Sequence, residues 1–223
     1  MIIHPKIDWH AIDTVLLDMD GTLLDLHFDN YFWFNHLPLR YAEAHGVSEK
    51  EARHFLSSEI KRFEGTLQWY CLDHWSELVK LDIPALKEEI RHKIKIRPHA
   101  EHFLQSLNRL GKKLVLITNS HPKGLELKLS VTNIDRWLDI VISSHEFSSP
   151  KEDQSFWHQL AQRESFDRQR TVFIDDTPRV LRSAQLFGIS HLVCITSPDS
   201  EKPPHLPEEF MGIEHFNEIM PTV

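Results

Sequence analysis

The segment DTVLLDMDGTLLDL, residues 13–26, decides how the rest of this chain folds. Its apolar residues Val15 to Leu17 run directly into two acids, Asp18 and Asp20. Such a run predicts a central strand of a parallel sheet, and open α/β sheets bind ligands at the carboxyl ends of these strands. Because residues alternate faces along an extended chain, Asp18 and Asp20 are expected to point the same way, with Met19 turned into the protein.

The pair Asp18 and Asp20 needs a physical reason, because two crowded carboxylates repel one another unless a cation joins them. A hard cation such as Mg²⁺ takes oxygen ligands and would neutralise that repulsion. The alternative is a solvated acidic turn. The apolar run before the acids and the Gly21-Thr22 that follows favour the metal site.

Length and composition exclude several classes of protein. A chain of 223 residues fits one large domain or a core with an insertion, and 41% hydrophobic and 26% charged residues are ordinary globular values. The net charge of −8 argues against nucleic acid or an anionic membrane as the main partner. A small phosphorylated metabolite remains possible, because a metal and a few local cations can reverse the sign at one site.

The cysteines and histidines offer no metal-binding motif in the sequence. Cys71 and Cys194 lie in different segments, with neither metal spacing nor a disulfide framework, so a reducing cytoplasm is expected. His99 and His102 could share a helix face, but without known zinc spacing they are expected at the surface. The first residues lack a signal-peptide pattern, and no segment is long enough to span a bilayer.

A polar and aromatic segment follows the first strand. Between residues 27 and 96 apolar residues recur every three or four positions, which predicts helices, and Ser48 with Glu51 forms a capping box. No strand-like alternation interrupts this segment. We therefore expect residues 27–96 to form an inserted α-helical cap over the acidic site, with residues 1–26 and 97–223 forming the core.

From residue 97 the pattern alternates between helix and strand. Strands are expected at 112–118, 138–143, 170–175 and 190–196, with helices at 98–111, 121–134, 152–164 and 177–188. A short strand or turn is expected near 211–216. This rhythm is typical of βαβ units, so the chain is predicted to be an α/β protein with a doubly wound, Rossmann-like parallel sheet.

Polar residues follow three further strands, and the topology should bring them to the edge that carries Asp18. Thr118 and Asn119 offer a hydroxyl and backbone amides to phosphate oxygens, although they could also cap the next helix. Lys151 could neutralise a phosphoryl group, or could simply be a solvated loop lysine. Asp175 and Asp176 add two carboxylates, and four acids at one edge would not fold together without a cation.

These motifs carry a resemblance to a known family. The run DMDGTLL resembles the first motif of the haloacid dehalogenase-like (HAD) phosphohydrolase superfamily. The whole chain, through FDNYFW, WYCLDHWSE, TNSHP, PKEDQ and FIDDT, is similar to the bacterial GMP/IMP 5′-nucleotidase group. The resemblance implies a HAD-like core under a helical cap, and an enzyme that hydrolyses phosphate monoesters.

The resemblance also implies roles for the site residues. Asp18 would be the nucleophile, Asp20 the acid/base and Lys151 the lysine of the third motif, which here is followed by Glu152 where relatives often have proline. Asp176 would be the metal-binding acid of the fourth motif. Mg²⁺ would be held by Asp18, Asp176 and the backbone carbonyl of Asp20, with Asp175 as a second ligand or an outer partner. Thr118 would help Lys151 to stabilise the phosphoryl oxygens.

The sequence therefore predicts a Mg²⁺-dependent phosphomonoesterase with an aspartyl-phosphate intermediate, acting on purine 5′-monophosphates with GMP and IMP ahead of AMP. Three alternatives stay open: a phosphatase of sugar phosphates or phosphoglycolate, a phosphotransferase or phosphomutase, and a non-catalytic nucleotide sensor. The base would be read by the cap, where Asn30, Gln68 and Asp73 are candidates. The aromatic residues of the cap are expected to form its core, and a subset could stack on a base: Tyr31, Trp33, Tyr41, Trp69, Tyr70 and Trp75.

Overall fold

The computed structural model describes residues 7–221, which form a six-stranded parallel sheet in the order β3-β2-β1-β4-β5-β6. Strand β1 (Thr14–Leu17) lies in the middle, between β2 (Lys113–Thr118) and β4 (Thr171–Asp175). The outer strands are β3 (Ile140–Ser143), β5 (His191–Ile195) and β6 (Met211–Ile213). The strand order reverses at β1, which is where open α/β sheets bind ligands. The predicted doubly wound sheet is confirmed.

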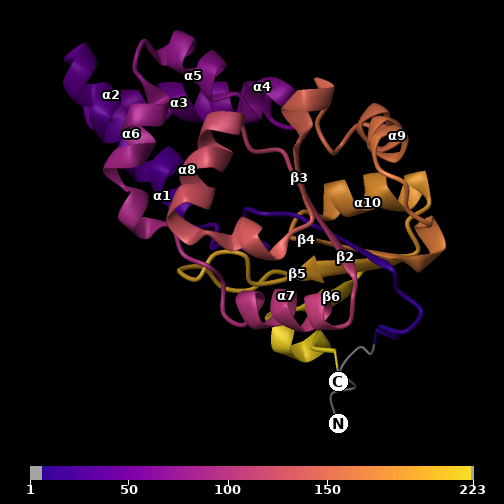
Figure 1. Cartoon of the computed structure of the whole chain (residues 1–223). Helices are drawn as coiled ribbons and strands as arrows, with labels where there is room; N and C mark the ends of the chain where they lie inside the picture. The colour runs from indigo at the N-terminus through magenta and orange to yellow at the C-terminus, as the bar shows by residue number, and fades with distance from the viewer. Residues whose placement is uncertain (1–6, 222–223) are drawn as a thin grey trace.

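Helices cover both faces of this sheet (Figure 1). Val15 and Leu17 pack in one cluster with α7 (Ala100–Arg109) and α8 (Pro122–Thr132), whereas Leu16 packs in another with α9 (Gln154–Arg163) and α10 (Pro178–Phe187). This alternation follows from the two-residue period of a strand. Four 3₁₀ turns complete this part of the chain: Ile134–Trp137, Ser144–Phe147, Arg168–Arg170 and Phe216–Ile219.

Residues 27–96, called the insertion below, contain only helices and turns. The helices are α1 (His27–Tyr31), α2 (Leu37–His45), α3 (Glu49–Phe63), α4 (Leu67–Tyr70), α5 (Leu72–Val79) and α6 (Ile83–Glu89), with a π-helical turn at Phe32–His36 and a 3₁₀ turn at Arg91–Lys93. They gather above one end of the sheet in Figure 1. The capping box of Ser48 and Glu51 at the start of α3 is confirmed.

The insertion leaves and re-enters the core at one place. Leu24 and Ile96 form an antiparallel bridge, and the Asp25 N–H donates to the Lys95 carbonyl at 2.9 Å. The buried Arg97 guanidinium donates to three carbonyls, those of Thr22, Ser197 and Glu214. Two neighbouring chain segments, one before and one after the insertion, thus connect it to the sheet edge that carries the acids.

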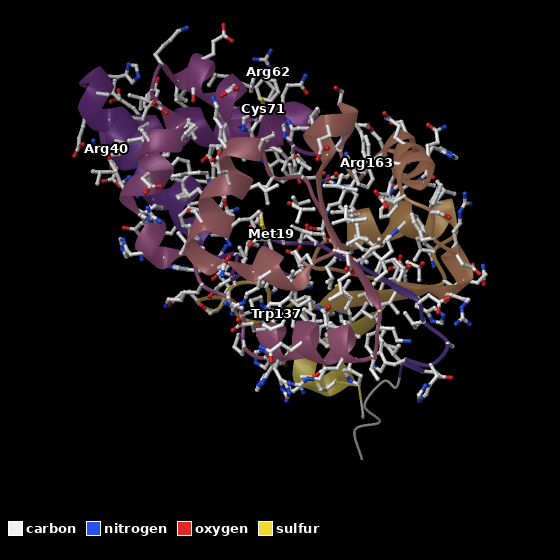
Figure 2. All side chains as sticks on the ribbon, viewed as in Figure 1. Met19, Arg40, Arg62, Cys71, Trp137 and Arg163 are labelled. Carbon is white, nitrogen blue, oxygen red and sulfur yellow. The ribbon has the colours of Figure 1, made fainter. Side chains whose placement is uncertain are left out.

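Figure 2 shows the side chains of the sheet, its flanking helices and the insertion. Trp75 is fully buried in the insertion, where its ring lies 5.0 Å from that of Trp33. Both cysteines are free, and His99 and His102 are exposed, as expected. None of the helices described is long and apolar enough to cross a membrane.

Gly21 is required by the turn that follows β1. Its φ is +89°, and a Cβ at this position would lie 2.5 Å from Asp176 Oδ2. Any side chain would therefore strain the backbone and displace an acid of the sheet edge.

Candidate active site

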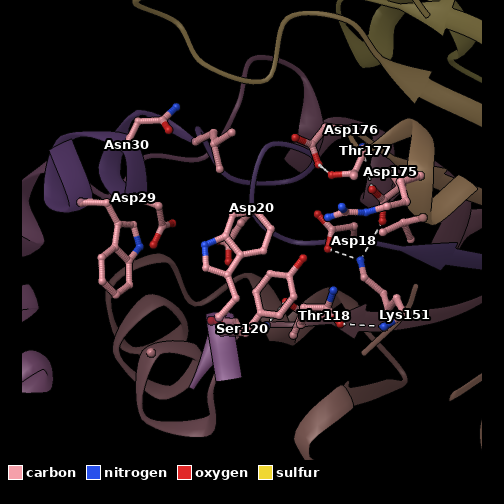
Figure 3. Close-up of a pocket in the computed structure, with 18 of the residues that line it drawn as sticks. Asp18, Asp20, Asp29, Asn30, Thr118, Ser120, Lys151, Asp175, Asp176 and Thr177 are labelled. Atoms are coloured by element: carbon pink, nitrogen blue, oxygen red, sulfur yellow. Dashed lines mark hydrogen bonds and ion pairs between the residues drawn. The ribbon is translucent and has the colours of Figure 1, made fainter. Parts of the chain in front are cut away.

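A cavity of about 540 Å³ lies between the carboxyl ends of the strands and the insertion. All seven residues predicted from sequence line it: Asp18, Asp20, Thr118, Asn119, Lys151, Asp175 and Asp176. Figure 3 shows Asp18 beside Lys151 and Asp175, with Asp20 further toward Asp29 of the insertion. Aromatic side chains from the insertion close the opposite wall: Trp33, Phe34, Trp69 and Tyr70. Asp18 and Asp20 thus face one cavity while Met19 is fully buried, as predicted.

Lys151 forms the first ion cluster of the cavity with Asp18 and Asp175. Its Nζ lies 2.5 Å from Asp18 Oδ1 and 2.7 Å from Asp175 Oδ2, and the residue is only 2% exposed. Burial favours the neutral amine, but the charges of Asp175 and Asp18 outweigh it and raise the pKa of Lys151. The solvated-loop interpretation of this lysine is therefore wrong, because its charge is enclosed and aimed at the sheet edge.

The three acids around this lysine carry more negative charge than one ammonium can balance. Carboxylate oxygens of Asp18, Asp175 and Asp176 lie within 4.8 Å of one another, and buried Asp18 Oδ2 has no hydrogen-bond partner in the described part of the chain. Burial raises the pKa of Asp18 to about 6 and that of Asp176 well above its ordinary value. An unpartnered oxygen among crowded carboxylates fits a hard divalent cation.

Asp175 and Asp176 differ in how many of their carboxylate oxygens already accept a hydrogen bond. Asp175 uses one oxygen for Lys151 and accepts the Thr177 N–H with the other at 2.8 Å. Within residues 7–221, the Asp176 carboxylate accepts only the Thr177 hydroxyl, at 3.2 Å. Asp176 is consequently the acid with more free oxygen capacity for a metal.

The loop after β2 organises Lys151. Asn119 Oδ1 accepts the Lys151 N–H at 2.9 Å, and its Nδ2 donates to Glu152 at 2.9 Å. The Thr118 hydroxyl accepts the Ser120 N–H at 3.0 Å, whereas the side chain that caps α8 is that of His121, which accepts the Lys123 N–H. The N-cap interpretation of Thr118 and Asn119 is therefore wrong.

A second ion cluster, which the sequence interpretation missed, holds Asp20. Lys128 Nζ of α8 lies 2.7 Å from Asp20 Oδ1 and 2.8 Å from Asp29 Oδ2, and Lys87 Nζ of α6 lies 2.7 Å from Asp29 Oδ1. Burial raises the pKa of Asp20 to about 6 against the opposing charge of Lys128. Burial also acts to raise the pKa of Asp29, but Lys128 and Lys87 lower it overall.

The sequence does hold one signal for this cluster. Lys87 stands four residues after Ile83 and three before Ile90, at a position of α6 where the helical period calls for an apolar side chain. Lys128 likewise follows buried Leu125 by three residues. A lysine on the apolar face of a helix needs an acidic partner inside the protein.

Glu152 connects the insertion to the loop that carries Lys151. The Tyr70 hydroxyl of α4 donates to Glu152 Oε1 at 2.7 Å, and the Arg179 guanidinium reaches the same oxygen at 3.3 Å. The carboxylate is only 8% exposed. Glu152, the residue directly after Lys151, is therefore hydrogen-bonded to the insertion.

The three residues suggested for reading a base do not lie together. Asn30 lines the cavity, and its Nδ2 donates to Asp199 at 2.6 Å. Gln68 and Asp73 are not part of the cavity wall, and Asp73 instead pairs with Lys123 at 2.6 Å. Of the three, Asn30 lies in the cavity wall, and base reading by Gln68 and Asp73 stays a prediction.

Comparisons with known proteins agree with this geometry. The family model of haloacid dehalogenase-like hydrolases matches residues 12–216. The chain is 40% identical over 220 residues to GMP/IMP nucleotidase YrfG of Escherichia coli (strain K12), with 99% of each protein covered. Both findings confirm the resemblance inferred from the sequence motifs.

Solved structures share the fold at lower identity. A HAD phosphatase from Thermococcus onnurineus superposes with a TM-score of 0.78 at 23% identity, covering 93% of this chain and 95% of its own. The HAD-hydrolase YfnB from Bacillus subtilis, bound to magnesium, gives 0.65 at 19% identity, covering 93% and 96%. With the family model spanning nearly the whole chain, these findings show that the protein belongs to the haloacid dehalogenase-like hydrolases.

Proposed function

We propose that this chain is a Mg²⁺-dependent phosphomonoesterase that hydrolyses purine 5′-monophosphates, GMP and IMP first, through an aspartyl-phosphate intermediate. The observation that carries the proposal is the unpartnered, buried Asp18 Oδ2 at the end of β1, beside Lys151 and facing the cavity. A carboxylate oxygen held without a partner near a fixed cation is suited to attack phosphorus.

The residues present suit Mg²⁺. Asp18, Asp176 and the carbonyl of Asp20 would hold the ion, with Asp175 as an outer partner that orients Lys151. When bound, the ion supplies positive charge to the phosphoryl oxygens and to the crowded carboxylates.

The chain's own residues account for the covalent steps. An Asp18 oxygen forms a bond to phosphorus while the bond to the ester oxygen breaks, and protonated Asp20 gives its proton to that oxygen. Asp20 then takes a proton from water, which attacks phosphorus and releases phosphate from Asp18. Lys151 and Thr118 stabilise the charge on the phosphoryl oxygens throughout.

The insertion, residues 27–96, is proposed as a cap domain on the core formed by 1–26 and 97–223. It supplies Trp33, Trp69 and Tyr70 to the cavity wall, where a flat base could stack. The volume of about 540 Å³ lies within the range of small-molecule sites. The curated relative at 40% identity acts on GMP and IMP, which supports the purine assignment. A cytoplasmic location stays a prediction from the cysteine content.

Phosphate release from a panel of monophosphates tests the proposal. With Mg²⁺ present, kcat/KM should be highest for GMP and IMP, lower for AMP and pyrimidine nucleotides, and lowest for sugar phosphates and phosphoglycolate. A tenfold preference for phosphoglycolate or a sugar phosphate would overturn the nucleotide assignment. Failure to hydrolyse any phosphate ester, including p-nitrophenyl phosphate, would overturn the phosphatase assignment.

A further inference from the structure

Three side chains from distant parts of the sequence meet beside the cavity, outside the acidic site. Cys71 lies at the start of α5 in the insertion, as labelled in Figure 2, whereas His121 precedes α8 and His145 follows β3 in the core. Cys71 Sγ and one ring nitrogen of each histidine lie within 4.8 Å of one another. The two imidazole rings are 5.0 Å apart in an edge-to-face arrangement.

The histidines of this group have nitrogens available to a ligand. His145 Nε2 is buried and has no hydrogen-bond partner among the described residues, while the ring is hydrogen-bonded to the backbone of Asn119. A buried, unpaired imidazole nitrogen on a ring that is held from its other side is available to bind a metal.

A fourth donor stands close to His121. Asp73 Oδ2 lies 3.6 Å from His121 Nε2, and this carboxylate belongs to the insertion, two residues after Cys71. Ligand atoms around a tetrahedral zinc ion are about 3.3–3.6 Å apart, given bond lengths of about 2.0–2.3 Å. Binding through His121 Nε2 moves the ring proton to Nδ1, at the cost of the long 3.3 Å hydrogen bond from the Lys123 N–H.

We propose that Cys71, His121 and His145, with Asp73 as the fourth ligand, bind a zinc ion that joins the insertion to the core. One thiolate, two imidazoles and one carboxylate are the ligand types that zinc accepts, and they differ from the all-oxygen set that suits Mg²⁺. Binding releases the Cys71 thiol proton. Because two ligands come from each part of the molecule, the bound ion holds the insertion against the sheet edge.

Metal titration tests this site without reference to catalysis. The purified protein, kept in saturating Mg²⁺ to occupy the acidic site, is titrated with Zn²⁺ by calorimetry and with Co²⁺ by absorption. The wild-type protein should bind one equivalent of either metal, and the Co²⁺ form should show a thiolate-to-cobalt charge-transfer band. Zn²⁺ should also raise the melting temperature, because it binds only the folded state.

Three variants decide the ligands. Cys71→Ser should lose the charge-transfer band, and both Cys71→Ser and His145→Gln should weaken Zn²⁺ binding by at least about tenfold. The matched control is Cys194→Ser, since burial raises the pKa of that thiol to about 12 and keeps it protonated. The control should retain the band. No band in the wild-type protein, a band that survives Cys71→Ser, or unchanged Zn²⁺ affinity in both variants would overturn the proposal.

Discussion

The two ion clusters of the cavity are built alike but connected differently. Each has one buried lysine between two carboxylates: Lys151 between Asp18 and Asp175, and Lys128 between Asp20 and Asp29. The first lies entirely in the core, at the ends of β1 and β4 and in the loop that carries Lys151. The second extends into the insertion through Asp29 and Lys87. The acid proposed to move protons is therefore the one whose charge balance depends on the insertion, whereas the charged partners of the proposed nucleophile all belong to the core.

The largest effect is expected from the first cluster. Asp18→Asn should leave a folded protein with no detectable phosphatase activity, because an amide cannot form the acyl phosphate. Phosphate release from GMP measures this, and nucleotide binding should persist. Turnover at a tenth or more of the wild-type rate would rule out the covalent mechanism.

Asp20→Asn should have the next largest effect. Loss of acid/base catalysis costs about 10²–10⁴-fold in rate. The loss should be greater for GMP than for p-nitrophenyl phosphate, because p-nitrophenolate leaves without a proton. Equal losses on both substrates would show that Asp20 does not protonate the leaving group.

Substitution of Lys128 tests whether the second cluster also stabilises the fold. Lys128→Met leaves the Asp20 carboxylate without its cation, and breaking a buried ion pair from one side costs about 3–5 kcal/mol. Urea denaturation should show this loss, and Asp20→Asn added to Lys128→Met should recover part of it, because Lys87 still balances the charge of Asp29. The matched control on the same helix is Lys123→Met, which removes an exposed pair with Asp73 and should change stability little. Equal effects of the two lysine variants would contradict the second cluster's role.

The contrast between the clusters also explains what the sequence could predict. The strands and six of the seven predicted residues follow from apolar runs that end in polar or charged side chains, because one periodicity determines both fold and site. Lys151 comes only after a loop that follows its strand, and its role came from the resemblance to the family's third motif. The same reasoning could not predict the ion pairs among Asp29, Lys87 and Lys128, since these pairs depend on how the insertion packs on the core. For the same reason the sequence could not predict that Cys71 lies beside His121 and His145, because their spacing in the sequence matches no known metal-binding motif.

Asp18 of the first cluster and Asp29 of the second should respond to pH with opposite signs in metal-free protein. The pKa of Asp18 is raised from 3.8 to about 6 by burial, so the folded state binds a proton more tightly than the unfolded state. Its contribution is present below about pH 4 and is lost as pH rises through 6, worth at most about 3 kcal/mol. Asp29 has a lowered pKa, so its contribution is present above pH 4 and is lost on further acidification.

Urea denaturation of metal-free protein between pH 4 and 8 measures the first of these effects. Stability relative to Asp18→Asn should rise as the pH falls from 7 to 4, and saturating Mg²⁺ should reduce this rise because bound metal replaces the proton. A difference between wild type and Asp18→Asn that does not change with pH would show that the Asp18 carboxylate is not destabilised by burial.

The smallest effect is expected at the contact that joins the insertion to the first cluster. Tyr70→Phe removes only the hydrogen bond from its hydroxyl to Glu152 Oε1, which is worth about 1.5–3 kcal/mol to a charged acceptor. Glu152 in turn holds the side chain of Asn119, which accepts the Lys151 N–H. Because this chain of hydrogen bonds positions Lys151 when the insertion is seated, kcat for GMP should fall about tenfold, and the free energy of unfolding should fall by no more than this one hydrogen bond contributes. Tyr41→Phe, in the same insertion but outside the cavity wall, is the matched control. A fall in stability without a fall in kcat would make Tyr70 a packing residue.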